Sequence, residues 1–292
     1  MTQPNPLLVR IESFLDRIER ALPMAPAEPD WDAALAFRWR HRGPHGYLQA
    51  IRHTGSVRLA DLQCIDRQKE LIVRNTRQFL AGLPANHVLL WGPRGTGKSS
   101  LIRALLNDCT GLGLRLIEIG REQGADLPDL YERLHQRGER FIIYCDDLSF
   151  ESADPAYQQL KVALDGSLCA VPDNVLLYAT SNRRHLVPEH MSENLETRMH
   201  DGELHPGETT EAKVSLAERF GLWLAFHPFD QDQYLHIVGY WLARFGAVAA
   251  DPAVLRAEAL RWALLHGSRS GRSAWQMARD WAGRCALERT AA

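Results

Sequence analysis

A glycine-rich segment followed by lysine and serine is the part of this chain whose spacing most clearly indicates chemistry. Residues 92–99 read Gly-Pro-Arg-Gly-Thr-Gly-Lys-Ser and fit the pattern G-x-x-x-x-G-K-[ST]. Glycines let backbone N–H groups turn toward phosphate oxygens, while Lys98 can reach the β- and γ-phosphates and Ser99 can bind Mg²⁺. The alternative is a chance glycine-rich turn. We expect a nucleoside triphosphate to be bound by Gly92, Pro93, Arg94, Gly95, Thr96, Gly97, Lys98, Ser99 and Ser100.

Two carboxylates and an amide follow apolar runs farther along the chain. Asp146 and Asp147 come directly after the run 140–145, and Asn182 follows the run 174–180. Sites in parallel sheets lie at the carboxyl ends of the strands. Asp146 is therefore expected to hold Mg²⁺, Asp147 to deprotonate the attacking water, and Asn182 to contact the γ-phosphate or that water. The alternatives are acids that solvate a strand end and an asparagine that starts a turn.

The elements that must position these residues follow from the apolar pattern. A helix is expected over residues 61–80. Apolar runs of strand length then alternate with helical stretches, which predicts an α/β fold with a parallel five-stranded sheet flanked by helices. The expected strands are 87–91, 115–119, 140–145, 174–180 and 222–227, and the helices that follow are 230–246, 252–266 and 271–288.

Three units are expected along the chain. Residues 1–58 form a helical N-terminal extension, with an amphipathic helix over 7–22 that is followed by prolines. Residues 59–229 form the nucleotide-binding domain, and residues 230–292 form a small α-helical lid domain. A length of 292 residues suits about two domains.

Composition narrows the class of protein. Hydrophobic residues make up 45% of the chain, enough for a sizeable core, and the net charge of −2 argues against coating nucleic acid by bulk charge. The five cysteines are scattered and odd in number, which favours reduced thiols and a cytoplasmic location. No apolar run approaches the ~20 residues that span a bilayer, so no membrane insertion is expected.

These motifs together resemble the AAA+ ATPase superfamily, the ring-forming branch of P-loop NTPases, over residues 59–288. The glycine loop is similar to Walker A, residues 141–147 are similar to Walker B, and Asn182 is similar to sensor 1. Phrases such as 65–69 and 145–151 resemble a bacterial AAA+ family called domain of unknown function 815.

The resemblance implies roles for two arginines. Arg219, in the phrase Arg-Phe-Gly before the last strand, resembles an arginine finger that would act in a neighbouring subunit, which implies a homo-oligomer. Arg198 is a rival for this role, and a salt-bridged surface arginine is the structural alternative. Arg272 resembles sensor 2 and would act on the nucleotide of its own chain, unless it too is only structural.

Two departures from the family pattern bear on activity. Asp147 stands where most AAA+ proteins have glutamate, so hydrolysis is expected to be slow or to be assisted by Glu151. The loop 120–126 lacks the aromatic-apolar-glycine pattern of polypeptide-threading pores.

These residues are compatible with three functions. The first is a Mg-ATP-hydrolysing AAA+ enzyme that remodels or loads a macromolecular partner as an oligomer. The second is an ATP-gated binding module with very slow hydrolysis. The third, a small-molecule kinase, is disfavoured because no small-substrate motif is visible.

The partner is expected to be an unidentified protein. Nucleic acid is the weaker alternative, which rests on the basic-aromatic stretch 37–42. For that stretch, docking onto its own domain is preferred. For the tryptophans of the last three helices, lid core is preferred over a ligand site; they are Trp241, Trp262, Trp275 and Trp281.

Overall fold

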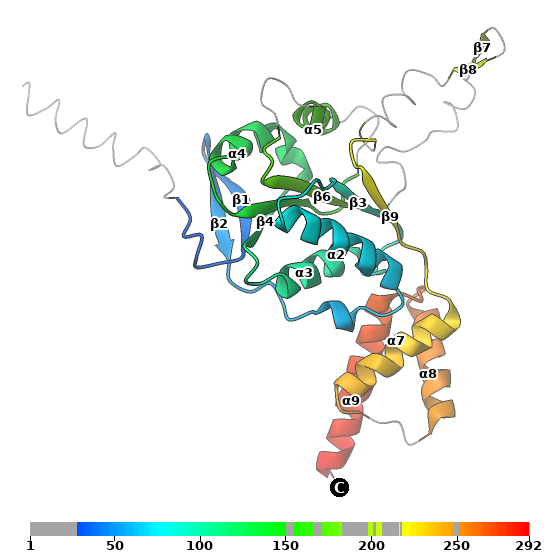
Figure 1. The fold of residues 1–292 in the computed structure, drawn as a ribbon. Coiled ribbons are helices and arrows are strands. Elements are labelled where there is room, and N and C mark those ends of the chain that lie inside the picture. Colours follow the sequence, from blue (N-terminus) through cyan, green and yellow to red (C-terminus); the bar gives the residue numbers. More distant parts are fainter. Residues whose placement is uncertain are drawn as a thin grey trace, which may run out of the picture.

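A mostly parallel sheet between two helical layers and a helical lid beside them make up the fold of the computed structural model (Figure 1). The residues described are 28–149, 155–165, 171–182, 198–200, 203–205, 216, 218–247 and 251–291. The helix expected over 7–22 lies outside them.

The five predicted strands are all present and parallel. They lie in the spatial order β4-β5-β6-β3-β9. Because neighbouring strands are parallel, the connections between strands include helices that cross the faces of the sheet. The runs are nearly continuous in apolar residues because helices cover both faces of the sheet. Their bounds are β3 (Val88–Trp91), β4 (Leu114–Ile119), β5 (Arg140–Cys145), β6 (Val175–Ser181) and β9 (Leu222–Ala225).

The prediction of five strands was too low, because two more strands extend the sheet. β1 (Ala36–Arg42) pairs in parallel with β4, and β2 (His45–Ile51) pairs antiparallel with β1 at the edge. These strands come from the part of the chain that was expected to form a helical extension. Phe37 and Trp39 alternate with arginines, which is the period of a strand with one buried face. The sheet therefore has seven strands.

Helices cover the two faces with separate apolar clusters. One cluster joins the sheet to the helices that follow β4 and β5; the other joins it to the helices before and after the glycine loop, and continues into the lid. On the first face lie η2 (Arg121–Asp126), α4 (Leu127–Leu134) and α5 (Pro155–Asp165). On the second lie η1 (Leu59–Asp61), α2 (Asp66–Leu80) and α3 (Lys98–Asp108).

The lid consists of the three predicted helices, α7 (Gln231–Arg244), α8 (Pro252–Leu265) and α9 (Gly271–Ala291). Asp230 starts α7 with a reciprocal cap: its carboxylate accepts from the Gln233 backbone N–H, and the Gln233 side chain accepts from the Asp230 N–H. Buried side chains of α7 and α9 share one cluster with the body. The lid is thus packed on the body.

A two-stranded antiparallel sheet lies apart from the main one. It is formed by β7 (Arg198–His200) and β8 (Glu203–His205). Across the described residues, no helix combines the length and the apolar character needed to cross a membrane.

Candidate nucleotide-binding site

The glycine loop has a backbone that only glycine adopts without strain. Gly92 has φ 138°, and a Cβ placed on it would lie 2.1 Å from the carbonyl oxygen of Phe226. Its N–H donates to Ser181 O of β6 (3.1 Å), so the loop starts wedged between the ends of β6 and β9. Gly97, with φ 103°, caps the start of α3. The predicted order of strand, loop and helix is therefore present, and α3 directs its N-terminus at the loop.

Lys98 lies inside the loop. Its ammonium donates to Gly92 O (2.6 Å), Pro93 O (2.8 Å) and the Asn182 side-chain oxygen (3.3 Å). Burial lowers the pKa of Lys98, and the nearby carboxylates of Asp147 and Asp146 oppose that shift. The loop thus places positive charge where a phosphate would be expected, next to the side chain of Asn182, which follows β6.

Asp146, at the end of β5, collects three hydroxyl donors on one oxygen. Its Oδ1 accepts from Ser99 Oγ (2.8 Å), Tyr144 OH (2.7 Å) and Thr180 Oγ1 (2.6 Å). Burial acts to raise the pKa of Asp146, but the hydroxyl donors outweigh it and hold the pKa below its usual value. Asp146 is therefore an ionised carboxylate beside the Ser99 hydroxyl. Both are hard oxygen donors of the kind that Mg²⁺ takes, so the residues fit this ion.

Asp147 differs from its neighbour in backbone and in partners. Its φ of 53° is left-handed, a region that aspartate tolerates better than most residues. Its backbone N–H donates to Thr180 Oγ1 (2.9 Å), while its carboxylate accepts from Asn182 Nδ2 (2.5 Å) and from Arg94 Nη2 (3.3 Å). The Asp147 side chain is 47% exposed. Lys98, Asp147 and Asn182 thus lie close together, with Asn182 bonded to both of the others.

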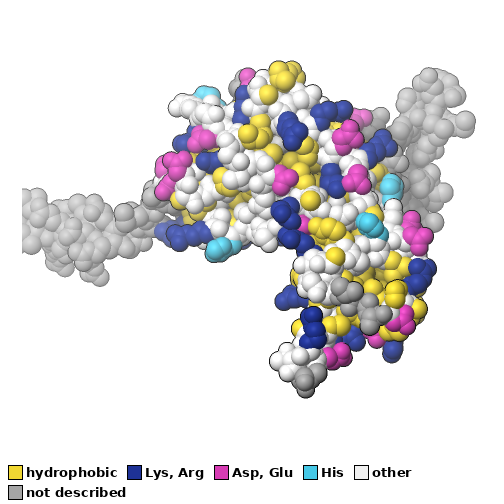
Figure 2. Space-filling view, turned by 60° about the horizontal axis from the view of Figure 1, so that its bottom comes forward, with side chains coloured by type: hydrophobic (Ala, Val, Ile, Leu, Met, Phe, Trp, Pro, Cys, Tyr) yellow, Lys and Arg dark blue, Asp and Glu magenta, His cyan; other side chains and the backbone are white. Residues whose placement is uncertain are grey.

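A cleft of about 740 Å³ opens between the loop, the segment before α2 and the lid. Arg272 lines it from the start of α9, and its backbone N–H lies 3.4 Å from Gly95 O. A Cβ on Gly95 would lie 2.8 Å from Ser270 Oγ, so the lid touches the loop directly. Figure 2 shows basic side chains where the body meets the lid.

Several lining residues were not predicted. Arg103 lies one helical turn after Ser99, and its Nε donates to Ser99 O (3.2 Å); its i+4 spacing could have identified it. Trp241 and Trp275 also line the cleft, although both were expected to belong to the core of the lid. Trp241 lines the cleft and also packs against the apolar cluster that continues into the lid. Other lining residues include Thr54, Gly55, Ser56, Val57, Leu62, Ile65, Phe229 and Ile237.

One buried carboxylate ties the lid to the body beside this cleft. Asp61, which is 4% exposed, accepts from Tyr240 OH of α7 (2.7 Å) and from the Arg58 backbone N–H (2.8 Å). Arg244 of α7 lies 3.5 Å from the same carboxylate. Burial acts to raise the pKa of Asp61, and the hydrogen bonds from Tyr240 and Arg58 outweigh it and lower the pKa.

The remaining predicted residues lie elsewhere or outside the described part. Arg219 is exposed and is not among the residues that line the cleft of its own chain. The backbone of Arg198 lies in β7. Glu151 is outside the described residues.

Comparisons with known proteins give a family and a fold. The family model described as "Protein of unknown function (DUF815)" matches residues 32–285. A search of curated proteins gave no match. Among solved structures, a lysine-to-arginine RuvB mutant of Thermotoga maritima is 15% identical over 77% of this chain, with a TM-score of 0.51. The ORC1 protein of Aeropyrum pernix in complex with DNA is 18% identical over 77% of this chain, with a TM-score of 0.49. The chain spans 64% of the RuvB chain and 61% of the ORC1 chain.

Proposed function

The chain belongs to the family described as protein of unknown function DUF815 and has the AAA+ fold, and we propose that it binds and hydrolyses Mg-ATP. One observation supports this above all others. Side chains from three elements, Lys98 of the loop, Asp146 after β5 and Asn182 after β6, converge at the carboxyl edge of one sheet.

Each side chain has a role in this proposal. Lys98 binds the β- and γ-phosphates. Their oxygens replace the loop carbonyls of Gly92 and Pro93, to which the ammonium donates in this structure. Ser99 and Asp146 would hold Mg²⁺, and the ion would neutralise charge on the phosphate oxygens. Asp147 accepts a proton from the attacking water, and Asn182 orients both Asp147 and the γ-phosphate. Arg272 brings the lid onto the nucleotide.

The oligomeric part of the proposal rests on Arg219. This arginine is exposed and lies away from the cleft of its own chain, and this position supports a role for it at the site of a neighbouring subunit. Arginine fingers contribute about 10³- to 10⁵-fold in rate. ATP would then join subunits, and its hydrolysis would drive the remodelling or loading of a macromolecular partner in the cytoplasm.

A second function has its own support. Asp147 is shorter than glutamate, has left-handed backbone geometry and is bonded to both Arg94 and Asn182. A carboxylate restrained in this way favours an ATP-gated switch that turns over very slowly.

The test is ATP turnover per subunit across a concentration series, with Arg219→Ala mixed into wild type. A shared-site oligomer gives turnover that rises with concentration and is poisoned by the variant. Arg256→Ala, which changes an exposed lid arginine, is the matched control and should not poison. Lys98→Ala should lose ATP binding. Turnover independent of concentration and of Arg219 would refute the shared site, and tight binding without turnover would favour the switch.

A further inference from the structure

The hairpin of β1 and β2 carries a concentrated positive charge in a chain that is slightly acidic overall. Residues 36–51, which form the hairpin, contain three arginines and two histidines and no aspartate or glutamate, whereas the whole chain has a net charge of −2. An isolated basic segment of this kind is an electrostatic signature of a polyanion partner.

The hairpin extends past the strand next to it in the sheet. β1 pairs with β4 only through residues 36–38, but it pairs with β2 through residues 36–42. At about 3.3 Å per residue, the last part of β1 extends about 13 Å past that contact. Because β1 is parallel to β4, the tip of the hairpin lies beyond the carboxyl end of β4.

The two faces of the hairpin are chemically opposite. Phe37, Trp39 and Leu48 are at most 5% exposed and pack into the body. The facing pairs Arg40↔Tyr47 and Arg42↔His45 lie on the other face, because directly opposed residues share a face. The Arg42 guanidinium lies 5.7 Å from the centre of the Tyr47 ring, which agrees with this assignment. We call this face, made by Arg40, Arg42, His45, Tyr47 and Gln49, the basic ribbon.

The guanidinium charges of the basic ribbon are not neutralised by the nearby carboxylates. Arg38 at its base is bound to Glu118 (2.7 Å), and His41 on the other face is paired with Asp126 (2.7 Å). Over the described part of the chain, Arg40 and Arg42 have no ion-pair partner, and both are exposed. The nearby carboxylates are therefore already used, and the two guanidiniums face solvent.

We propose that the basic ribbon binds the phosphodiester backbone of a nucleic acid. Guanidinium forks match phosphate oxygens in geometry, and a two-stranded ribbon is one of the elements that the major groove of DNA admits. The ribbon has no exposed apolar anchor, since Tyr47 is half-buried beside Arg42, whereas protein interfaces depend on such anchors. The aromatic rings of the stretch 37–42 are buried, so base stacking on them plays no part.

This binding surface is separate from ATP hydrolysis, and its test needs no turnover. Fluorescence anisotropy of the full chain would be measured with labelled single-stranded DNA, duplex DNA and single-stranded RNA of about 16 nucleotides. Measurements at about 50 mM and about 200 mM salt give the salt dependence. The three probes distinguish which nucleic acid supplies the phosphates.

Three variants make the test specific. Arg40→Gln/Arg42→Gln should weaken binding of the preferred probe about tenfold or more and reduce the salt slope by about two. Arg40→Lys/Arg42→Lys keeps the charge and should lie between this variant and wild type. Arg256→Gln/Arg289→Gln removes the same charge from exposed lid positions and should bind as wild type does. Matching circular dichroism and ATP binding would establish that each variant is folded.

Three results would overturn the proposal. The first is no binding by wild type to any probe at the lower salt concentration. The second is equal loss in the ribbon and lid double variants. The third is binding of poly-glutamate with the affinity and salt slope seen for nucleic acid, which would assign the ribbon to an acidic protein. None of these results bears on ATP turnover, so the proposed ATPase can stand or fail separately.

Discussion

The two ends of the cleft are built in different ways. At the phosphate end, hydroxyl, carboxylate, amide and ammonium groups from β5, β6 and α3 bond to one another across distances of 2.5–3.3 Å. At the lid end, the lining is mostly apolar, and a single buried carboxylate, Asp61, ties α7 to the body. The phosphate end is a preorganised polar site, whereas the lid end is mainly a packed contact, with Asp61 as its buried polar anchor.

The difference indicates that the two ends of the cleft have different roles. A polar network with fixed donors suits charge that must be stabilised during reaction. A packed contact with few polar bonds can move as a unit when those bonds are loosened, which suits a lid that responds to the nucleotide. Changes at the phosphate end should therefore affect chemistry, and changes at the lid end should affect stability and affinity.

The largest expected effect comes from Asp147→Asn. Asparagine tolerates the left-handed backbone at this position and keeps a polar side chain beside Asn182, but it cannot accept the proton of water. Turnover should fall about 10²- to 10⁴-fold, while ATP affinity measured by fluorescent-nucleotide titration stays near that of wild type. A variant that retains turnover would exclude Asp147 as the base and redirect attention to Glu151.

A smaller effect is expected from Tyr240→Phe at the lid end. This change removes the hydroxyl that donates to the buried Asp61 carboxylate. A lost hydrogen bond to a charged group costs about 1–3 kcal/mol in the free energy of unfolding, and ATP affinity should fall several-fold because the lid is less firmly held. Chemical denaturation and nucleotide titration measure the two quantities.

The matched control for this change is Tyr234→Phe. The Tyr234 hydroxyl donates to Ala259 O (3.2 Å) within the lid, so its loss should lower stability and leave ATP affinity unchanged. Equal effects of the two variants on affinity would show that Asp61 is no special anchor.

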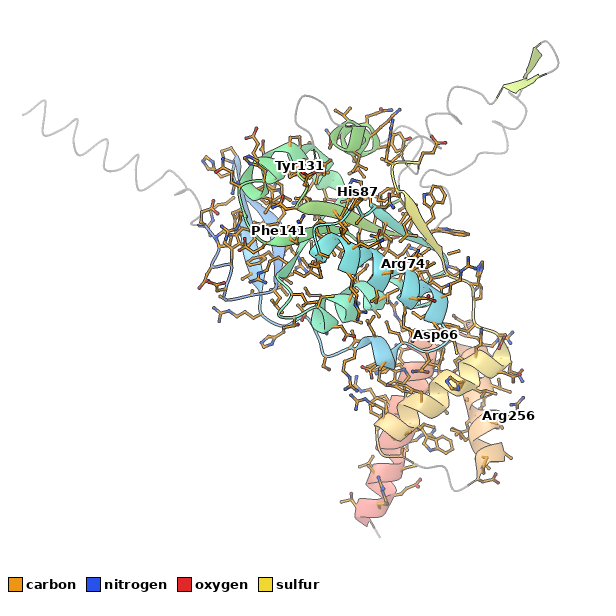
Figure 3. All side chains as sticks on the ribbon, viewed as in Figure 1. Asp66, Arg74, His87, Tyr131, Phe141 and Arg256 are labelled. Atoms are coloured by element: carbon orange, nitrogen blue, oxygen red, sulfur yellow. The ribbon has the colours of Figure 1, made fainter. Side chains whose placement is uncertain are left out.

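The smallest expected effect separates stability of the body from chemistry at the site. His87 lies at the opposite end of β3 from the loop (Figure 3). Its Nδ1 accepts a hydrogen bond from the Leu177 N–H (3.0 Å). Burial lowers the pKa of His87 from its usual value of 6.5. Below about pH 6.5 the imidazole is protonated in the unfolded chain, whereas in the folded chain it stays neutral to a lower pH. His87 therefore lowers the free energy of unfolding as the pH falls.

The variant His87→Asn places an amide oxygen near the Nδ1 position and cannot titrate. The decline in unfolding free energy between about pH 7 and about pH 5 should be smaller by about 1 kcal/mol than in wild type. His53→Asn, which changes an exposed imidazole, is the control and should leave the decline as it is. An unchanged decline in His87→Asn would mean that other groups account for the pH dependence.

Much of the phosphate end was predictable, and less of the lid end was. Lys98 and Ser99 were identified by spacing within one loop, and Asp146 and Asn182 by their places after apolar strands. Trp241 was assigned to lid core because a tryptophan on a helix has the same local pattern whether it packs inside or lines a cleft. The contact between Asp61 and Tyr240 joins residues that are far apart in the sequence, and no local pattern relates them.

The sequence alone determined the chemistry of the loop and the set of five parallel strands, because these depend on residue types at short spacing. The tertiary structure decided what depends on distant contacts. It turned the segment 36–51 into two further strands by pairing with β4, and it buried Phe37 and Trp39 while leaving Arg40 and Arg42 in solvent. It also placed the start of α9 against Gly95. A period of two indicates that one face of a strand is buried, but only the packed neighbour decides which face that is.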